Sequence, residues 1–188
     1  MLVNRERLPM IAKKIRQSLA LICLTVAISS CSGSDEDAGR AINFTNASFS
    51  VTLTEAQITS QFAEIYNFVL PSLTTDQLTE KTLFAPSNNA LEVFFSENSE
   101  TLEGVLVKPD VARQLVLIHL LEQEMSASSL LNMNGETLTM LNGSSFIVDS
   151  SDGSVQIVQE SGKNSKIIAI DLASTDGVVH IIDRVLQP

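Results

Sequence analysis

The sequence predicts an α+β fold in which helices come first and a sheet follows, and three observations support it. Apolar residues recur at helical spacing between residues 58 and 118. From Glu122 onward the apolar period shifts toward two, and four turn dipeptides divide that region: Asn134-Gly135, Asn142-Gly143, Asp152-Gly153 and Asp176-Gly177. Because helices precede strands instead of alternating with them, the pattern favours α+β over a doubly wound parallel sheet.

The first predicted helix runs to Val69 and is preceded by a capping signal. Thr54-Glu-Ala-Gln57 has the pattern of a capping box, in which a hydroxyl and an amide satisfy the first free N–H groups. Behind it, one helical face carries Ile58, Phe62, Ile65, Tyr66 and Val69. Pro71 is expected to end the helix because its ring cannot continue the backbone hydrogen bonds.

A short strand and two further helices are predicted next. The strand covers residues 81–85 and is ended by Pro86, after which Ser87 can cap a helix. That helix is expected to bury Ala90, Leu91, Phe94 and Phe95. A third helix starts at Pro109, a favourable first-turn residue, and its apolar stripe holds Val111, Leu115, Ile118 and, one residue off the stripe, Leu121.

The C-terminal half is predicted to form the sheet. Its strand candidates are residues 136–140, 145–149, 155–158, 166–171 and 178–183. A domain of this size buries roughly 68–70% of its unfolded surface, so we expect it to fold without a disulfide or a metal.

The N-terminal segment differs from the rest of the chain in charge and composition. Residues 1–30 carry a net charge of +4, so the overall −10 leaves −14 for the other 158 residues. A basic stretch precedes the uncharged run Leu19–Ile28, which at ten residues is too short to span a bilayer. These features predict an export signal in residues 1–30. Its exit, Ile28-Ser29-Ser30-Cys31, resembles the bacterial lipobox.

The lipobox predicts cleavage between Ser30 and Cys31 and lipidation of the Cys31 thiol by a diacylglyceryl group, with a further acyl chain such as palmitate on the new amine. Two or more chains give stable membrane anchoring. The alternative is an ordinary cleaved signal with a chance cysteine. Residues 31–44 are small, polar and acidic, and are expected to form a flexible tether. We expect an exported lipoprotein of the cell envelope, in the outer membrane of a Gram-negative host because Ser32, not Asp, follows Cys31.

Two segments of residues 45–188 resemble the motifs of fasciclin-type domains. Thr82–Leu91 resembles the first motif, through Thr82, Phe84, Ala85, Pro86 and Ala90. Ile168–Pro188 resembles the closing motif, through Gly177, His180, Asp183 and Pro188. His119 stands in the place of the family's intervening Tyr-His motif, with Ile118 where the family has Tyr. The resemblance implies a wedge of β-sheet flanked by N-terminal helices, and those motif residues are expected to stabilise the fold.

The two histidines of the chain, His119 and His180, lie among aliphatic residues and are expected on a helix and a strand. Two interpretations remain for them. They are either hydrogen-bonded core residues or ligands of a metal site completed by Asp171 or Asp183. No HxxxH, HxH or CxxC spacing supports the metal site, so we expect core residues and no metal.

Nothing in the sequence indicates an enzyme or a cofactor. It has no G-x-S-x-G, P-loop or G-x-G-x-x-G pattern, and Cys31, the cysteine of the mature chain, would be acylated. We expect Glu97, Glu100 and Glu103 to form a solvated helix face, and Asp183 to pair locally with Arg184. The acidic charge excludes nucleic acid as a partner, because phosphates require a basic surface.

These observations predict a binding module on a membrane tether. The leading hypothesis is adhesion or interaction with a surface protein, a matrix polymer or a second copy of the domain. The alternative is a periplasmic carrier or accessory protein with an enclosed pocket for a small apolar ligand. A hydrolase is the third hypothesis, and it requires a cleft with convergent polar groups and a perturbed carboxylate or histidine.

Overall fold

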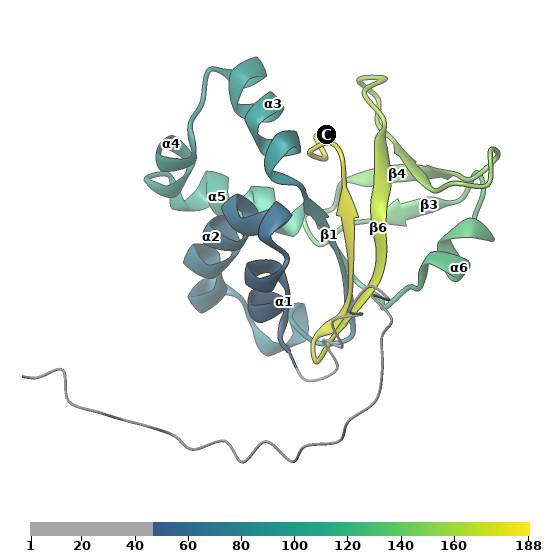
Figure 1. Cartoon of the computed structure of the whole chain (residues 1–188), viewed down its shortest axis with the longest axis horizontal. Helices are drawn as coiled ribbons and strands as arrows, with labels where there is room; N and C mark the ends of the chain where they lie inside the picture. Colours follow the sequence, from purple (N-terminus) through teal and green to yellow (C-terminus); the bar gives the residue numbers. More distant parts are fainter. Residues whose placement is uncertain (1–46) are drawn as a thin grey trace, which may run out of the picture. The chain divides into compact units, whose positions relative to one another are not determined.

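The computed structural model describes residues 47–188 (Figure 1). The predicted signal peptide of residues 1–30 and the tether of residues 31–44 lie outside the described residues, and so do Ser30 and Cys31. Over the described part of the chain, no helix has the length and apolar character needed to cross a bilayer.

Five of the helices lie on one side of the sheet (Figure 1). They are α1 (Phe49–Glu55), α2 (Ser60–Val69), α3 (Asn88–Asn98), α4 (Leu102–Leu106) and α5 (Pro109–Leu117). A sixth, α6 (Ala127–Leu131), lies by strands β3 and β4. Short 3-10 turns at Gln57–Thr59, Leu70–Ser72 and Thr75–Gln77 complete the helical part.

The sheet has seven strands in the order β2-β1-β7-β6-β5-β4-β3. Their bounds are β1 (Lys81–Pro86), β2 (Leu120–Leu121), β3 (Thr137–Thr139), β4 (Ser145–Asp149), β5 (Gln156–Val158), β6 (Ser165–Ser174) and β7 (Gly177–Ile182). Strands β1 and β7 are parallel, and the other neighbours are antiparallel. A bridge between Leu121 and Met140 joins the two ends of this order, so the sheet is nearly closed.

Strand β1 is buried on both faces because it separates two apolar cores. Successive side chains of a strand point to opposite faces. Leu83 and Ala85 therefore join the core under the helices, with Phe62 of α2, while Phe84 enters the core enclosed by the sheet. The second core also contains Leu130 of α6, so that helix covers the sheet's inner space.

The α+β prediction is confirmed, and most elements fall where the sequence places them. Strand β4 has the predicted bounds, and β3, β5, β6 and β7 overlap their predicted ranges. Ser87 caps α3 by accepting a hydrogen bond from the Ala90 N–H at 3.2 Å, and Pro109 is the first residue of α5.

The predicted capping box at Thr54 is wrong. Thr54 lies inside α1, a helix that the periodicity did not predict, and its hydroxyl donates to the carbonyl of Ser50 at 2.8 Å. Helix α2 begins only at Ser60, after a 3-10 turn. Ile58, in that turn, is 51% exposed and does not belong to the buried face.

Three further expectations are corrected. Val111 is 48% exposed although it matches the apolar stripe of α5, and His119 lies in the turn after that helix. Glu97 and Glu103 belong to different helices, with Glu100 between them, so the three carboxylates do not share one helix face.

Candidate functional site

The first motif contains a buried hydroxyl that joins β1 to the segment after β2. The Thr82 side chain is fully buried, donates to the carbonyl of Gln123 at 2.8 Å and accepts from the N–H of Met125 at 2.7 Å. The neighbouring motif residues Phe84 and Ala85 are also fully buried, and Ala90 packs in the first core. Pro86 is the last residue of β1.

The closing motif brings β7 against β1 through Gly177. A Cβ atom at this position would lie 1.9 Å from the carbonyl oxygen of Lys81, and the backbone has φ = +138°. Only glycine allows both the close approach and this backbone conformation. Gly177 therefore fixes the register of the parallel β1–β7 pair, in which Lys81 is its direct neighbour.

Asp183 secures the other end of β7, and not through the expected pair. Its carboxylate accepts from the Lys166 N–H at 2.7 Å, and its own N–H donates to the Lys166 carbonyl at 3.0 Å. Arg184 instead lies 3.7 Å from Glu97 of α3. The local Asp183–Arg184 pair is thus absent from the ion pairs of residues 47–188.

His119 is a fully buried, neutral core residue. Its Nδ1 lies 2.7 Å from the carbonyl oxygen of Leu115, and its Nε2 accepts from the N–H of Leu186 at 3.0 Å. The carbonyl requires a proton on Nδ1, and the N–H requires a bare Nε2, so one tautomer satisfies both contacts. Burial lowers the pKa of His119 to about 4, and the ring packs against Phe62 at a centroid distance of 5.4 Å.

His180 has the opposite tautomer. Its Nε2 lies 2.9 Å from the Met125 carbonyl oxygen, which requires a proton there, and its Nδ1 accepts from the Asp171 N–H at 3.2 Å. Burial holds the pKa of His180 below its usual range. The ring lies 5.7 Å from that of Phe84, its direct neighbour in the sheet.

Both nitrogens of each histidine ring face backbone groups. All four imidazole nitrogens are occupied by backbone groups, so neither histidine has a nitrogen free for a metal or for proton transfer. Within residues 47–188, no group of three or more His, Cys, Asp or Glu side chains is arranged to hold a metal ion. The two histidines also pack against different cores. His119 contacts Phe62 of the first core, and His180 contacts Phe84 of the second.

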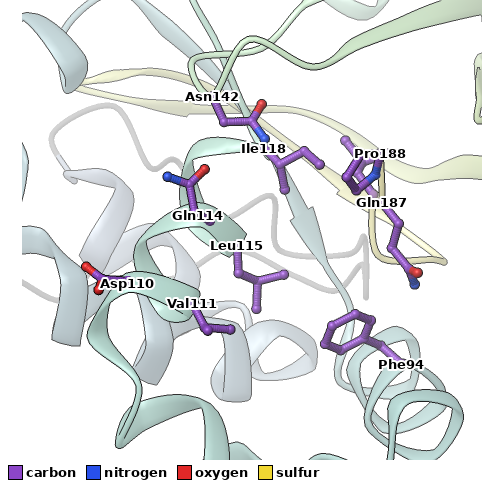
Figure 2. Close-up of a pocket in the computed structure, with 10 residues that line it drawn as sticks. Phe94, Asp110, Val111, Gln114, Leu115, Ile118, Asn142, Gln187 and Pro188 are labelled. Carbon is purple, nitrogen blue, oxygen red and sulfur yellow. The ribbon is translucent and has the colours of Figure 1, made fainter.

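An apolar groove of about 470 Å³ lies between α3, α5 and the C-terminal segment, which consists of residues 186–188 (Figure 2). Its lining residues are Phe94, Asp110, Val111, Gln114, Leu115, Ile118, Asn142, Leu186, Gln187 and Pro188. Figure 2 shows the side chains of Val111, Leu115 and Ile118 from α5 and its end facing the same hollow as the Phe94 ring. A concave, mainly apolar surface with a few polar groups is the usual form of a binding site.

The groove contains two residues that the motifs singled out. Ile118, in the place of the family Tyr, forms part of its floor, and Pro188 closes one side. The other motif residues lie elsewhere, in the β1–β7 pair and the cores. The sequence did not identify the groove because its lining comes from four separate segments of the chain. Val111 is an apolar residue that stays exposed, which indicates a binding surface, but its exposure is known only from the structure.

Comparison with protein families gives a match to the fasciclin domain over residues 60–188. Over 118 residues the chain is 30% identical to fasciclin-1 of Drosophila melanogaster, and this alignment covers 59% of this chain and 17% of that protein. It is 34% identical over 107 residues to transforming growth factor-beta-induced protein ig-h3 of Sus scrofa, covering 57% and 14%. The chain thus spans less than a fifth of the length of these relatives.

The fold agrees with this match. A solved structure of a FAS1 domain pair from the insect cell adhesion molecule fasciclin I aligns with a TM-score of 0.53 and 28% sequence identity. The alignment covers 70% of this chain and 46% of that one. The motifs, the nearly closed sheet and the sequence match agree, and the chain belongs to the fasciclin domain family.

Proposed function

We propose that the protein is an exported, lipid-anchored lipoprotein of the cell envelope whose fasciclin domain mediates adhesion to a protein or matrix partner. The family match carries the binding part, because the relative of solved structure is a cell adhesion molecule. The sequence Ile28-Ser29-Ser30-Cys31 supports anchoring through Cys31. In a Gram-negative host we propose the outer membrane as the destination.

A non-catalytic role fits the chemistry of the described residues. The buried histidines are neutral and fully hydrogen-bonded to backbone groups, so they offer no free general base. The groove is lined mainly by carbon, which suits the burial of apolar surface from a partner more than the stabilisation of a developing charge.

Anchoring is tested by metabolic labelling with a radioactive fatty acid. The wild type should incorporate label and sediment with membranes, whereas Cys31→Ala should lose the label and leave the membrane fraction or accumulate as precursor. Cys23→Ala is the matched control, since Cys23 lies in the apolar run of the predicted signal and should not affect labelling. An unlabelled wild type, or a labelled Cys31→Ala, contradicts the anchor.

Adhesion is tested by comparing attachment of three strains to cells and matrix-coated surfaces. One strain carries the wild type, one carries Cys31→Ala, and one lacks residues 45–188. Attachment should fall in both altered strains, because the first loses the anchor and the second loses the binding domain. Unchanged attachment of the deletion strain contradicts the adhesive role.

Binding of a small apolar ligand is the second candidate, and the groove favours it. Its volume of about 470 Å³ lies within the range of small-molecule sites. It opens at the surface, however, and is not the enclosed pocket that a carrier of apolar ligands needs to exclude water. Native mass spectrometry of the purified full chain distinguishes the candidates, because a carrier should retain a ligand of defined mass.

A further inference from the structure

We propose that the groove between α3, α5 and the C-terminal segment binds a peptide segment of a partner protein, in which a bulky aliphatic or aromatic side chain lies next to Lys or Arg. The inference rests on the interaction role proposed above. It adds the binding surface and the chemistry of the partner to that role.

The floor of the groove is the part that would bind the aliphatic or aromatic side chain of the peptide. Leu115 and Ile118 are packed into the domain with 8% and 4% exposure, and they belong to the first and the second apolar core respectively. Val111, one turn earlier on α5, remains 48% exposed at the side of the groove. An incoming aliphatic or aromatic side chain would cover Val111 and the Phe94 ring and remove both from water.

The rim of the groove carries the negative charge that would bind the Lys or Arg of the peptide. Asp110 is the only lining residue of the groove with an ionisable side chain. Lys108 pairs with Glu100 at 2.7 Å, and Arg184 lies 3.7 Å from Glu97. Arg113, one turn further along α5, forms no ion pair with Asp110 and does not line the groove. Asp110 takes part in none of the ion pairs formed among residues 47–188, and it thus offers its charge to a basic group on the partner.

The remaining lining residues favour a peptide over a lipid. Gln114, Asn142 and Gln187 place carboxamide groups around the apolar floor. The Asn142 oxygen accepts from the Ser144 N–H at 3.0 Å, whereas the carboxamides of Gln114 and Gln187 can both donate to and accept from peptide groups. Fatty acids and phospholipids with net negative charge are disfavoured, because they would meet Asp110 and a chain of net charge −10.

The groove also lies at the end of the sheet opposite to the point where the described chain begins. The Ala47 carbonyl accepts from the Thr175 N–H in the turn that precedes β7, whereas the groove residues Leu186 and Pro188 follow the far end of β7. Six residues of strand separate the ends by about 17 Å. Ala47, the first described residue, and the groove therefore lie at opposite ends of β7.

The test measures the affinity of the purified full chain, kept in a non-ionic detergent, for three fluorescent octapeptides. The first has Lys-Leu-Phe-Lys between Gly-Ser flanks, the second has Glu in place of both Lys, and the third has Ser in place of Leu and Phe. Only the first should bind measurably. Asp110→Asn should weaken its binding about threefold, and the effect should shrink in high salt. Val111→Ser should weaken it about fivefold.

Two matched variants control for nonspecific effects. Asp152→Asn removes an acidic charge from an exposed turn, and Val107→Ser removes an exposed valine that does not line the groove. Both should bind the first peptide as the wild type does. All four substituted side chains are exposed, so we expect every variant to fold. Thermal unfolding of each variant checks this.

Several results would overturn the proposal. Equal binding of the Lys and Glu peptides, or equal effects of Val111→Ser and Val107→Ser, would remove the assigned chemistry. A lipid retained in native mass spectra, or self-association abolished by Val111→Ser without peptide binding, would assign the groove to another occupant. If deletion of residues 45–188 abolishes adhesion but Asp110→Asn and Val111→Ser do not reduce it, the adhesive role stands and the groove assignment fails.

Discussion

The carboxylate of Asp176 accepts a hydrogen bond from the backbone N–H of Phe49 at 2.9 Å, across 127 residues of sequence. Phe49 is the first residue of α1, and the preceding Ser48 provides no side-chain cap. The β6–β7 turn therefore supplies the acceptor that the helix lacks, and it places a negative charge at the positive end of the helix dipole.

Asp176→Ala should lower the free energy of unfolding by about 1–2 kcal/mol, because the N–H of Phe49 loses its partner. Asp176→Asn keeps an acceptor oxygen and should lose less than half of that. The measurement is urea unfolding followed by circular dichroism. Asp152→Ala is the control, since Asp152 also precedes a glycine but bonds only nearby residues such as Ser154. Equal losses at both positions would contradict the capping role.

Gly177→Ala should destabilise the domain by about 3 kcal/mol or more, because the new Cβ meets the Lys81 carbonyl and the backbone stays at positive φ. Gly153→Ala shares the positive φ, at +80°, but meets no atom within 4 Å, so it should cost only about 1 kcal/mol. The difference between their unfolding midpoints reports the close approach of β1 and β7 together with the additional strain of φ = +138° over φ = +80°. Similar midpoints would show that backbone strain alone matters at both positions.

Thr82→Val should lower the free energy of unfolding by about 2 kcal/mol, although valine has nearly the same shape. It removes the acceptor of the Met125 N–H and the donor to the Gln123 carbonyl, and the site is buried. Thr82→Ser keeps the hydroxyl and should retain most of the stability. If the serine variant is the less stable of the two in urea unfolding, packing of the methyl group and not hydrogen bonding explains the position.

Local patterns predicted the elements that depend on neighbouring residues. The alternation of residues 145–149 and the first-turn preference of Pro109 each placed an element correctly, because the forces involved act within a few residues. Helix α1 escaped prediction since its N-terminal partner is Asp176, far along the chain. The Thr54 pattern was misleading for the same reason: a hydroxyl and an amide at the right spacing cap a helix only if one starts there.

The binding groove was beyond sequence reasoning for a related physical reason. Its walls come from α3, α5 and the last residues of the chain, and nothing in their separate patterns indicates that they meet. The apolar stripe predicted that Val111 would be buried, because periodicity reports the direction of a side chain and not whether another element covers it. Its exposure became informative only with the fold known.

The two histidines should show opposite tautomers in solution. His119 should carry its proton on Nδ1 and His180 on Nε2, because each faces a backbone carbonyl with that nitrogen. Long-range 1H–15N correlation spectra at pH 7.5 distinguish the tautomers by the shift of each ring nitrogen. Two identical patterns, or rapid exchange between tautomers in either ring, would contradict the assigned hydrogen bonds.

Acid should destabilise the domain through His119. Its pKa is about 4 in the folded state and near 6.5 when unfolded, so between these values only the unfolded chain binds the proton. The stability is fully present above pH 6.5 and is lost as the pH falls toward 4, by about 3 kcal/mol from this residue. His180 should act in the same direction, because its pKa is also lowered.

His119→Gln separates this effect from the titration of carboxylates. The variant should be less stable than the wild type at pH 7.5, because glutamine cannot reproduce both imidazole contacts. Its unfolding free energy should nevertheless fall less steeply between pH 6.5 and 4. The slope against pH counts the protons taken up on unfolding, and the variant lacks the proton, up to one, that His119 takes up. Urea unfolding at closely spaced pH values gives both slopes. Parallel curves for the two proteins would mean that His119 is protonated in the folded state, which would break its bond from the Leu186 N–H.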